Sequence, residues 1–246
     1  MSPQGPSPRQ GPNNRTILWI VAVVAVVVLL VRSHHLSTFS VLAFVAFVPS
    51  IILHELTHGA VAHALGDDTA KRQGLLTWNP VKHIDPFGTV LIPALMALTT
   101  FGVLGWAKPM PWTRNRLRHS RRDDLLVYLS GPAVNALLAL VFLVAYRYGV
   151  PLHDKFGFDL GPVWAQFLFY AGYINALLTI LYLIPLPPLD GAAVVERFLP
   201  PQQLSEYQRI RPFTIFVPVA LVLLFPQAFN HIFIPALNRW AQLAGV

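Results

Sequence analysis

An H-E-x-x-H motif, residues 54–58, lies in the middle of a long apolar segment of this chain. On a helix each residue turns about 100°, so His54 and His58 lie roughly 40° apart and can bind one Zn²⁺ together. Glu55 lies beside them, within reach of a water at the metal. Two histidines and a glutamate in an apolar helix are unfavourable unless they are paired or bound to a metal. The motif therefore favours a hydrolytic metal site among apolar residues over a chance match on a buried helix.

The composition is that of a membrane protein. Of the 246 residues, 54% are hydrophobic and 12% are charged, whereas a soluble domain has about 25% charged residues. Cysteine is absent, so any metal must be held by His, Asp, Glu or water, and disulfide bonds are excluded. The net charge of +7 comes from loops between apolar runs, which favours the lipid bilayer over nucleic acid as the partner.

Apolar runs predict an all-α polytopic membrane protein, a helical bundle of about five to six transmembrane segments. Residues 1–16 are rich in Pro, Gly and polar residues, typical of a disordered tail. We expect residues 17–246 to form a single integral-membrane domain with its catalytic core at about residues 39–200, and no connection is long enough for a separate PDZ domain. The predicted full spans are Ile17–Val31, Phe39–Leu65, Leu125–Tyr146, Val163–Ile184 and Phe213–Leu237.

The path of a further apolar segment, Phe87–Trp106, is decided by charge. If it crosses the membrane fully, ten Lys and Arg residues lie inside and eight outside. If it enters and returns on one side, fourteen lie inside and four outside. Because cytoplasmic loops carry an excess of Lys and Arg, we expect a re-entrant or membrane-docked segment. The same topology places the metal motif toward the cytoplasmic side.

A third ligand is expected, because a catalytic zinc usually takes three protein ligands and a water. His63 is a poor candidate, since it points about 140° away from the second motif histidine. Glu196 and Glu206 remain possible on spacing alone. Asp190 is better placed, because the prolines before it cannot continue a helix and Gly191 lets the backbone turn. The alternative for Asp190 is an N-cap of the next short helix.

Taken together, the motifs of this chain resemble the site-2 protease family of intramembrane zinc metalloproteases, in its minimal form without a PDZ domain. The resemblance covers roughly residues 40–200. It rests on His54-Glu55-Leu56-Thr57-His58, Gly131-Pro132-Ala133-Val134-Asn135, Pro185-Leu186-Pro187-Pro188-Leu189-Asp190-Gly191, Asn79-Pro80, His83-Ile84-Asp85-Pro86-Phe87-Gly88-Thr89 and Gly105-Trp106-Ala107-Lys108-Pro109.

This resemblance implies that His54, His58 and Asp190 bind one Zn²⁺ per chain and that Glu55 is the general base. It implies a core of three helices and a hydrolase that uses a zinc-activated water to cleave a peptide bond within or near a transmembrane helix of a membrane-protein substrate. Such regulated intramembrane proteolysis would take place in the bilayer, in a prokaryotic plasma membrane, with the active site toward the cytoplasm.

One position departs from the family pattern. Members usually have Asn eight residues before the metal-binding Asp, where it holds the substrate backbone, and this chain has Tyr182. Tyr182 or Asn135 is therefore expected to contact substrate or the oxyanion. His83 and Asp85 are candidates to support the site from behind the ligands, although Asp85 before a proline is also typical of a turn.

Two other classes of function remain open. One is a non-proteolytic membrane protein, either a metal transporter or a scaffold (pseudoprotease) that has lost catalysis. The other is a metallopeptidase with a peripheral, soluble-facing site, which the apolar flanks of His54 disfavour. The basic stretch 114–122 fits either inner-leaflet anchoring or a dock for an acidic substrate tail. The natural substrate and the oligomeric state do not follow from the sequence.

Overall fold

Three long helices form the centre of the protein. The computed structural model describes residues 38–93, 105–149, 161–214 and 226–246. Within these ranges all regular structure is helical, and residues 74–79 form a run of turns and bends. Three helical stretches are long and apolar enough to cross a membrane: Val41–Ala64, Ser120–Gly149 and Val163–Tyr182.

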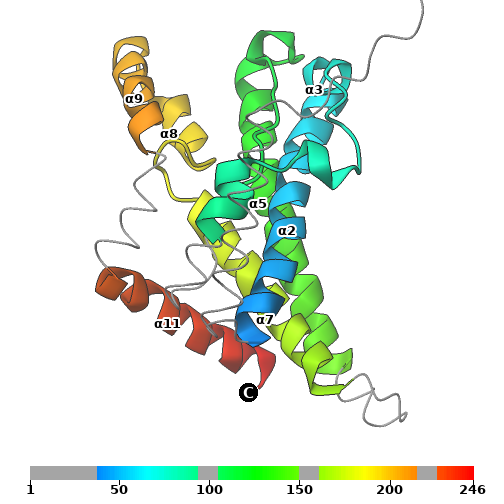
Figure 1. Cartoon of the computed structure of the whole chain (residues 1–246). Coiled ribbons are helices and arrows are strands. Elements are labelled where there is room, and N and C mark those ends of the chain that lie inside the picture. The colour runs from blue at the N-terminus through cyan, green and yellow to red at the C-terminus, as the bar shows by residue number, and fades with distance from the viewer. Residues whose placement is uncertain (1–37, 94–104, 150–160, 215–225) are drawn as a thin grey trace, which may run out of the picture.

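Those stretches belong to α2 (Thr38–Ala64), to α5 (Ser120–Val144) with the π-helical turn η4 (Ala145–Gly149), and to α7 (Gly161–Tyr182). They match three of the predicted spans. The three helices lie side by side along most of their length (Figure 1). Small residues on the facing surfaces, among them Ala43, Ala46 and Ala171, are buried with Phe47 and Ile174 in their common core, which lets the helix axes approach closely.

Helix α7 ends where the prolines begin. Pro185, Pro187 and Pro188 lack an N–H and cannot continue the helical ladder. The chain then turns back, so that Gly191 N–H donates to Tyr182 O at 2.7 Å. The short helix α8 (Ala192–Phe198) follows, and then α9 (Pro201–Thr214). This non-helical break places Asp190 beside α2.

The segment Phe87–Trp106 comes back to the place where it starts. Its first part forms the π-helix η2 (Pro86–Leu91), which follows the 3₁₀ turn η1 (Pro80–Lys82). At its far end, Trp106 N–H donates to Gly88 O at 3.0 Å. The two ends of the segment therefore lie together, which agrees with a re-entrant path. A full crossing would separate the two ends by the thickness of the bilayer. Residues 94–104 lie outside the described residues.

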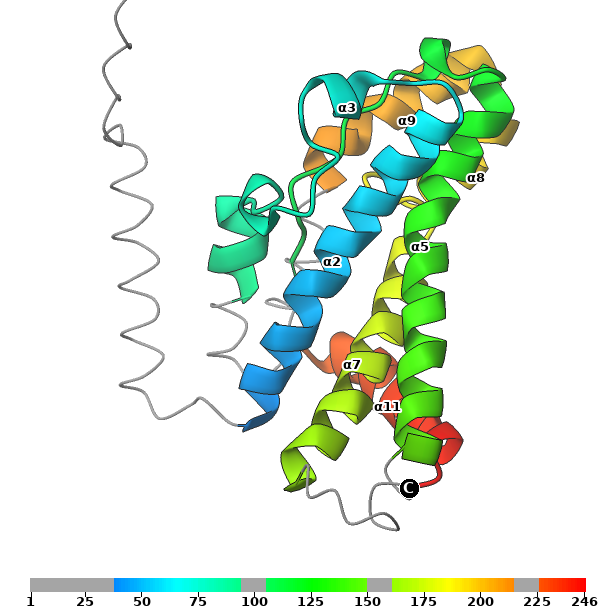
Figure 2. The same ribbon diagram turned by 90° about the vertical axis from the view of Figure 1, so that its right-hand side faces the viewer.

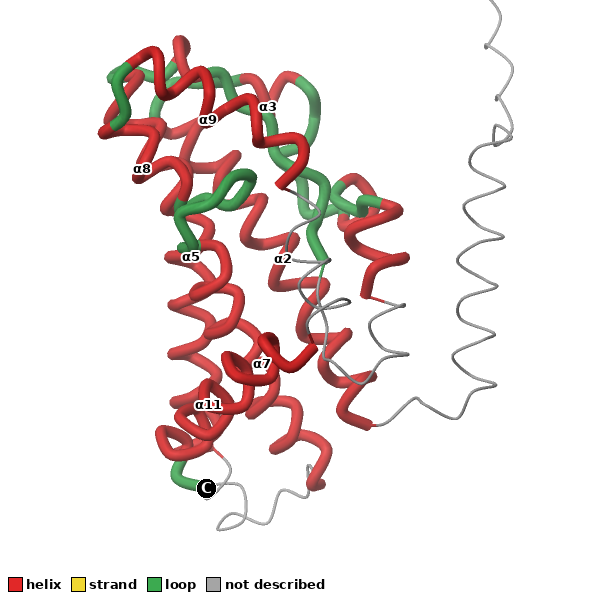
Figure 3. The backbone as a smooth tube through the Cα atoms, turned by 90° about the vertical axis from the view of Figure 1, so that its left-hand side faces the viewer, coloured by secondary structure: helices red, strands yellow, loops and turns green. Residues whose placement is uncertain are grey.

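Two predicted spans are not matched in this way. The first, Ile17–Val31, lies outside the described residues, as does the tail at residues 1–16. Of the last, Phe213–Leu237, residues 215–225 lie outside the described residues; on either side of them the structure has α9, which includes Thr214, and α11 (Pro226–Ala244), which extends beyond the predicted end. Helix α11 packs across α7 at the end remote from α8 (Figures 1 and 3), where Trp240 Nε1–H donates to Phe169 O at 3.1 Å.

Candidate metal centre

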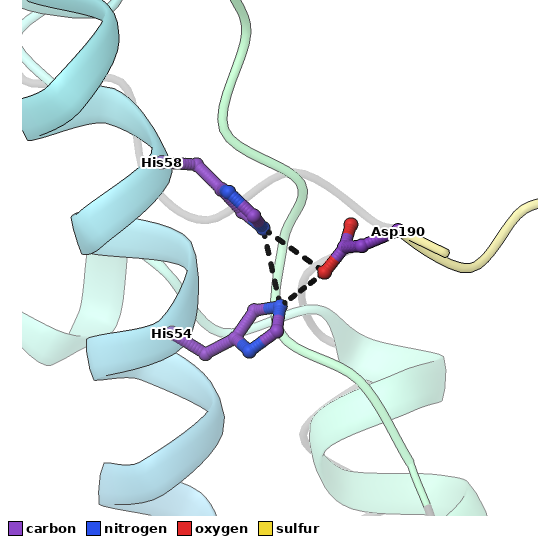
Figure 4. Close-up of side chains that lie close together, drawn as sticks. All are labelled: His54, His58 and Asp190. Carbon is purple, nitrogen blue, oxygen red and sulfur yellow. Dashed lines mark hydrogen bonds and ion pairs between the residues drawn. The ribbon is translucent and has the colours of Figure 1, made fainter. Parts of the chain in front are cut away.

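Two histidines one helical turn apart form the first half of the site. His54 and His58 lie on the face of α2 that is directed at α5 and α7, and their exposed fractions are 0% and 1%. Their Nε2 atoms are 3.1 Å apart, and their rings are perpendicular with centroids 4.7 Å apart. The i, i+4 spacing of the motif therefore produces the shared face that the sequence predicts (Figure 4).

Asp190 completes the cluster from the break after α7. Its Oδ2 lies 2.9 Å from His54 Nε2 and 3.4 Å from His58 Nε2. The alternative that Asp190 caps the next helix is wrong, because Gly191 occupies the N-cap position of α8 and no side chain caps it. Among the described residues, the His, Asp and Glu groups close enough to share a metal ion are these three. Glu196 and Glu206 are not part of the cluster.

The hydrogen bond at Nδ1 of His58 fixes the protonation of its other ring nitrogen, Nε2. His58 Nδ1–H donates to Val127 O of α5 at 2.7 Å, so the Nε2 of a neutral ring carries only a lone pair. That lone pair faces Asp190 Oδ2, a buried oxygen without a hydrogen-bond donor among the described residues. Two imidazole nitrogens and a carboxylate oxygen this close together form a group that could hold a metal ion.

The spacing of the three atoms fits zinc. Tetrahedral ligands at about 2.0–2.1 Å from one ion lie roughly 3.3 Å apart. The three observed separations, 3.1, 2.9 and 3.4 Å, bracket this value. Two imidazole nitrogens and a carboxylate oxygen are a typical donor set of a catalytic zinc that leaves one position for water.

Asn135 of α5 lies behind His54. Its amide nitrogen is 3.1 Å from His54 Nδ1, and its amide oxygen is buried without a partner among the described residues. If the oxygen and nitrogen of the Asn135 amide are interchanged, His54 Nδ1–H donates to the amide oxygen. The Nε2 of His54 then keeps a lone pair for a metal ion. The structure thus places Asn135 beside Nδ1 of His54, on the side of the ring away from Asp190. Its predicted contact with substrate stays a prediction.

Gly131 allows α5 to approach the two histidines. A Cβ at this position would lie 2.5 Å from His54 Cε1 and 2.6 Å from His58 Cε1. Both distances are far below van der Waals contact, so any larger residue would displace the imidazoles. Of the Gly131-Pro132-Ala133-Val134-Asn135 motif, the first residue therefore lies against both histidines and the last lies against His54.

Glu55 and Tyr182 lie next to the three ligands. Glu55 Oε2 accepts a hydrogen bond of 2.7 Å from the backbone N–H of Met110. The ring of Tyr182 lies over that of His54, with centroids 4.0 Å apart and planes 31° from parallel. Tyr182, at the position where the family usually has Asn, therefore packs on a candidate metal ligand.

His83 and Asp85 belong to the loop before η2. His83 is buried, and its Nε2 is paired with Thr77 O at 2.9 Å. Asp85 caps η2 by accepting from the N–H groups of Phe87 and Gly88. In the described part of the chain neither forms a hydrogen bond with a ligand side chain. Their predicted support of the site stays a prediction, and the turn interpretation of Asp85 matches its geometry.

Two backbone groups at the site were not found from the sequence: the carbonyl of Val127 and the N–H of Met110. Every residue type offers such groups, so no side-chain pattern reveals Val127 O. The N–H of Met110 had one signal, because the prolines at 109 and 111 make it the single donor of a three-residue stretch.

Comparison with known proteins identifies the family. The sequence profile of "Peptidase family M50" matches residues 42–225. The chain is 35% identical over 201 residues to "Putative zinc metalloprotease YwhC" of Bacillus subtilis, covering 79% of this chain and 84% of that protein. It is 32% identical over 204 residues to "Putative zinc metalloprotease Rip2" of Mycobacterium tuberculosis, covering 81% and 70%. No solved structure matches significantly. The chain belongs to peptidase family M50, the site-2 protease family of zinc metalloproteases.

Proposed function

We propose that this metalloprotease is an intramembrane endopeptidase that hydrolyses a peptide bond within or near a transmembrane helix of a membrane-protein substrate. One observation carries the proposal. In the cluster of His54, His58 and Asp190, the two histidines, with Glu55 beside them, lie on α2, which is apolar and long enough to cross a membrane, and Asp190 lies in the break that follows α7, a second such helix. A hydrolytic site in that setting acts on chains that share the bilayer.

The residues divide the chemistry between them. Bound zinc supplies a Lewis acid, which lowers the pKa of a water toward neutrality and polarises a carbonyl. Glu55 takes the proton of the attacking water and then delivers it to the amine that leaves when the peptide bond breaks. Asn135 and Val127 O orient the two histidines through their Nδ1 atoms, as partners behind metal ligands usually do.

Substrate contact is assigned to Tyr182 and, as the second candidate, Asn135. The Tyr182 hydroxyl offers one donor to a carbonyl or oxyanion, where the usual Asn offers both a donor and an acceptor. A helical substrate must unwind before cleavage, and its freed backbone groups need partners. We propose the region Phe87–Trp106 for that pairing, including residues 94–104 outside the described range.

The active site is proposed to face the cytoplasm, in the plasma membrane of a prokaryote. Helices α3 (Thr69–Arg72), α8 and α9 and the turn η3 (Arg114–Arg116) lie at the same end of the bundle (Figure 1) and are rich in Lys and Arg. An excess of basic residues marks the cytoplasmic side. The basic stretch 114–122 would contact anionic lipid at that surface.

Cysteine-accessibility labelling tests this topology. The chain has no cysteine, so Lys71→Cys, Arg116→Cys and Arg147→Cys each give a single reactive site. We expect a membrane-impermeant maleimide to label the first two only from the cytoplasmic side, because the re-entrant path keeps both loops there. Arg147→Cys, at the other end of α5, should be labelled from the opposite side. Labelling of positions 71 and 116 from opposite sides would contradict the topology.

A non-proteolytic role is the alternative. A transporter needs polar ligands along a path across the membrane, whereas in the described residues the candidate ligands converge at one place. A scaffold would have no need for a carboxylate held beside the metal. We therefore favour the protease, and the peripheral-site alternative is disfavoured by the apolar length of α2.

Metal removal tests the proposed function directly. The full chain in lipid nanodiscs is incubated with a panel of single-span membrane proteins, and cleavage is followed by mass spectrometry. We expect products from wild type, none after zinc is stripped with a chelator, and recovery after one equivalent of zinc per chain is added. Cleavage that persists in metal-free protein, or a zinc-loaded protein that cleaves nothing in the panel, would overturn the proposal.

A further inference from the structure

An extended stretch of chain, Trp106–Thr113, passes beside α2 and the metal cluster (Figures 2 and 4); we refer to it as the proline segment. It is held in place along its length by backbone donors. Trp106 N–H donates to Gly88 O at 3.0 Å, Lys108 N–H donates to His83 O at 2.8 Å, and Thr113 N–H donates to the carboxylate of Asp67. The segment therefore has a defined position relative to α2.

Asp67 anchors the C-terminal end of the proline segment. It is buried just beyond the end of α2 and also accepts from Thr69 N–H at 3.0 Å and from Thr69 Oγ1–H at 2.6 Å. Burial raises the pKa of Asp67, but the hydrogen bonds from Thr69 and Thr113 outweigh this and hold it below its usual value. An ionised acceptor with several donors ties the segment firmly to the helix that carries Glu55.

At its centre the segment has a single backbone donor. Pro109 and Pro111 have no N–H, so Met110 supplies the one donor of these three residues. That N–H is directed at Glu55 Oε2, at 2.7 Å. A hydrogen bond from an N–H to a carboxylate is roughly twice as strong as a hydrogen bond between two neutral groups.

The side chain of Met110 fixes the same residue a second time. It is 3% exposed and packs against Gly59, one turn after Glu55 on α2. A Cβ on Gly59 would lie 2.7 Å from Met110 Cγ and 2.9 Å from Leu76 Cδ2. Met110 thus occupies a notch in α2 that exists because Gly59 has no side chain.

We propose that Met110 is a positioning residue of the protease: its backbone N–H, isolated between two prolines, holds Glu55 in the orientation from which the carboxylate takes and returns a proton. This inference rests on the proposed function. Met110 itself exchanges no proton and contacts no reacting atom. It reduces the conformations open to a flexible glutamate, holding one oxygen while the other serves as the base.

The contact is tested without turnover by NMR. The chain has three methionines, Met1, Met96 and Met110, so the full chain labelled with [¹⁵N]methionine gives a spectrum simple enough to assign with Met110→Leu. In Glu55→Ala we expect the Met110 amide to shift upfield and to exchange with D₂O at least about tenfold faster, as for the loss of a hydrogen bond to a charged group. The amide of Met96 serves as the reference. An unchanged Met110 resonance would overturn the contact.

Turnover separates the N–H from the side chain. Met110→Ala and Met110→Pro both remove the long side chain, but only the second removes the N–H. We expect Met110→Pro to lower kcat roughly ten- to one-hundredfold below Met110→Ala, with KM and bound zinc unchanged, and Met110→Leu to retain most of the turnover. Equal loss in the alanine and proline variants would assign the effect to packing and overturn the proposal.

Faster turnover in Met110→Pro would also overturn it, since the contact would then be a latch that restrains Glu55. If Met110→Pro does not fold, the NMR comparison with Glu55→Ala decides. If wild type cleaves no substrate at all, the proposed function fails, and positioning fails with it, while the NMR result still reports whether Met110 donates to Glu55. Failure of the inference and failure of the function are thus distinguished.

Discussion

Glu55→Gln is expected to leave zinc bound and to lower the turnover of a transmembrane substrate by at least about a hundredfold, within the range typical of losing a general base. Glutamine has nearly the shape of glutamate and can still accept from Met110 N–H, so the packing around α2 is kept. It cannot take a proton from water at neutral pH. The measurement is kcat in nanodiscs together with the zinc content by mass spectrometry.

The chain offers a matched control for this variant. Glu206→Gln makes the same chemical change at an exposed position of α9 and should cleave like wild type. Equal cleavage by Glu55→Gln and wild type would remove Glu55 as the base. Loss of zinc along with activity would instead point to a structural defect, and the assignment of Glu55 would need other support.

Asp190→Asn is expected to weaken zinc binding by more than about one hundredfold, beyond the range seen when only a partner behind a ligand is removed. The substitution keeps the size of the side chain but removes the negative charge opposite His54 and His58. A neutral amide oxygen is a much poorer zinc ligand than a carboxylate. The affinity is measured by competition with a chromophoric chelator.

Asp68→Asn provides the comparison for Asp190. Asp68 is paired with His63 at 2.7 Å on the surface, so the same loss of charge there should leave the zinc affinity unchanged. Retention of wild-type affinity by Asp190→Asn would show that the third ligand is another group. Activity should fall in parallel with zinc occupancy and return in part at high zinc concentration, which distinguishes weak binding from a defect in chemistry.

The sequence predicted the parts of the site that depend on local structure, but not the backbone groups that tertiary packing brings to it. The spacing of His54 and His58 implies a shared helix face, and the prolines before Asp190 imply a break in a helix; both are local properties, and the structure has both. Val127 O and Met110 N–H are backbone groups brought in from α5 and the proline segment. Their positions depend on tertiary packing, which residue spacing does not encode.

The last span shows a different limit. Phe213–Leu237 is apolar enough to suggest a single crossing, and its residues 215–225 lie outside the described part of the chain. At the C-terminal side, hydropathy over a window does not mark where the helix ends. Helix α11 begins at Pro226 and continues to Ala244, with Trp240 buried against α7.

With His54, His58 and Asp190 as the proposed ligands, the placement of Asp190 in the break after α7 would make a bound metal ion a cross-link. Its carboxylate and the two imidazoles of α2 come from elements that no covalent bond joins except through more than a hundred intervening residues. An ion held by both couples the stability of the bundle to the free zinc concentration. Under the proposed function, a movement that separates α2 from the end of α7 would also break the bonds to the metal ion, so a substrate would have to reach the site while these two elements stay together.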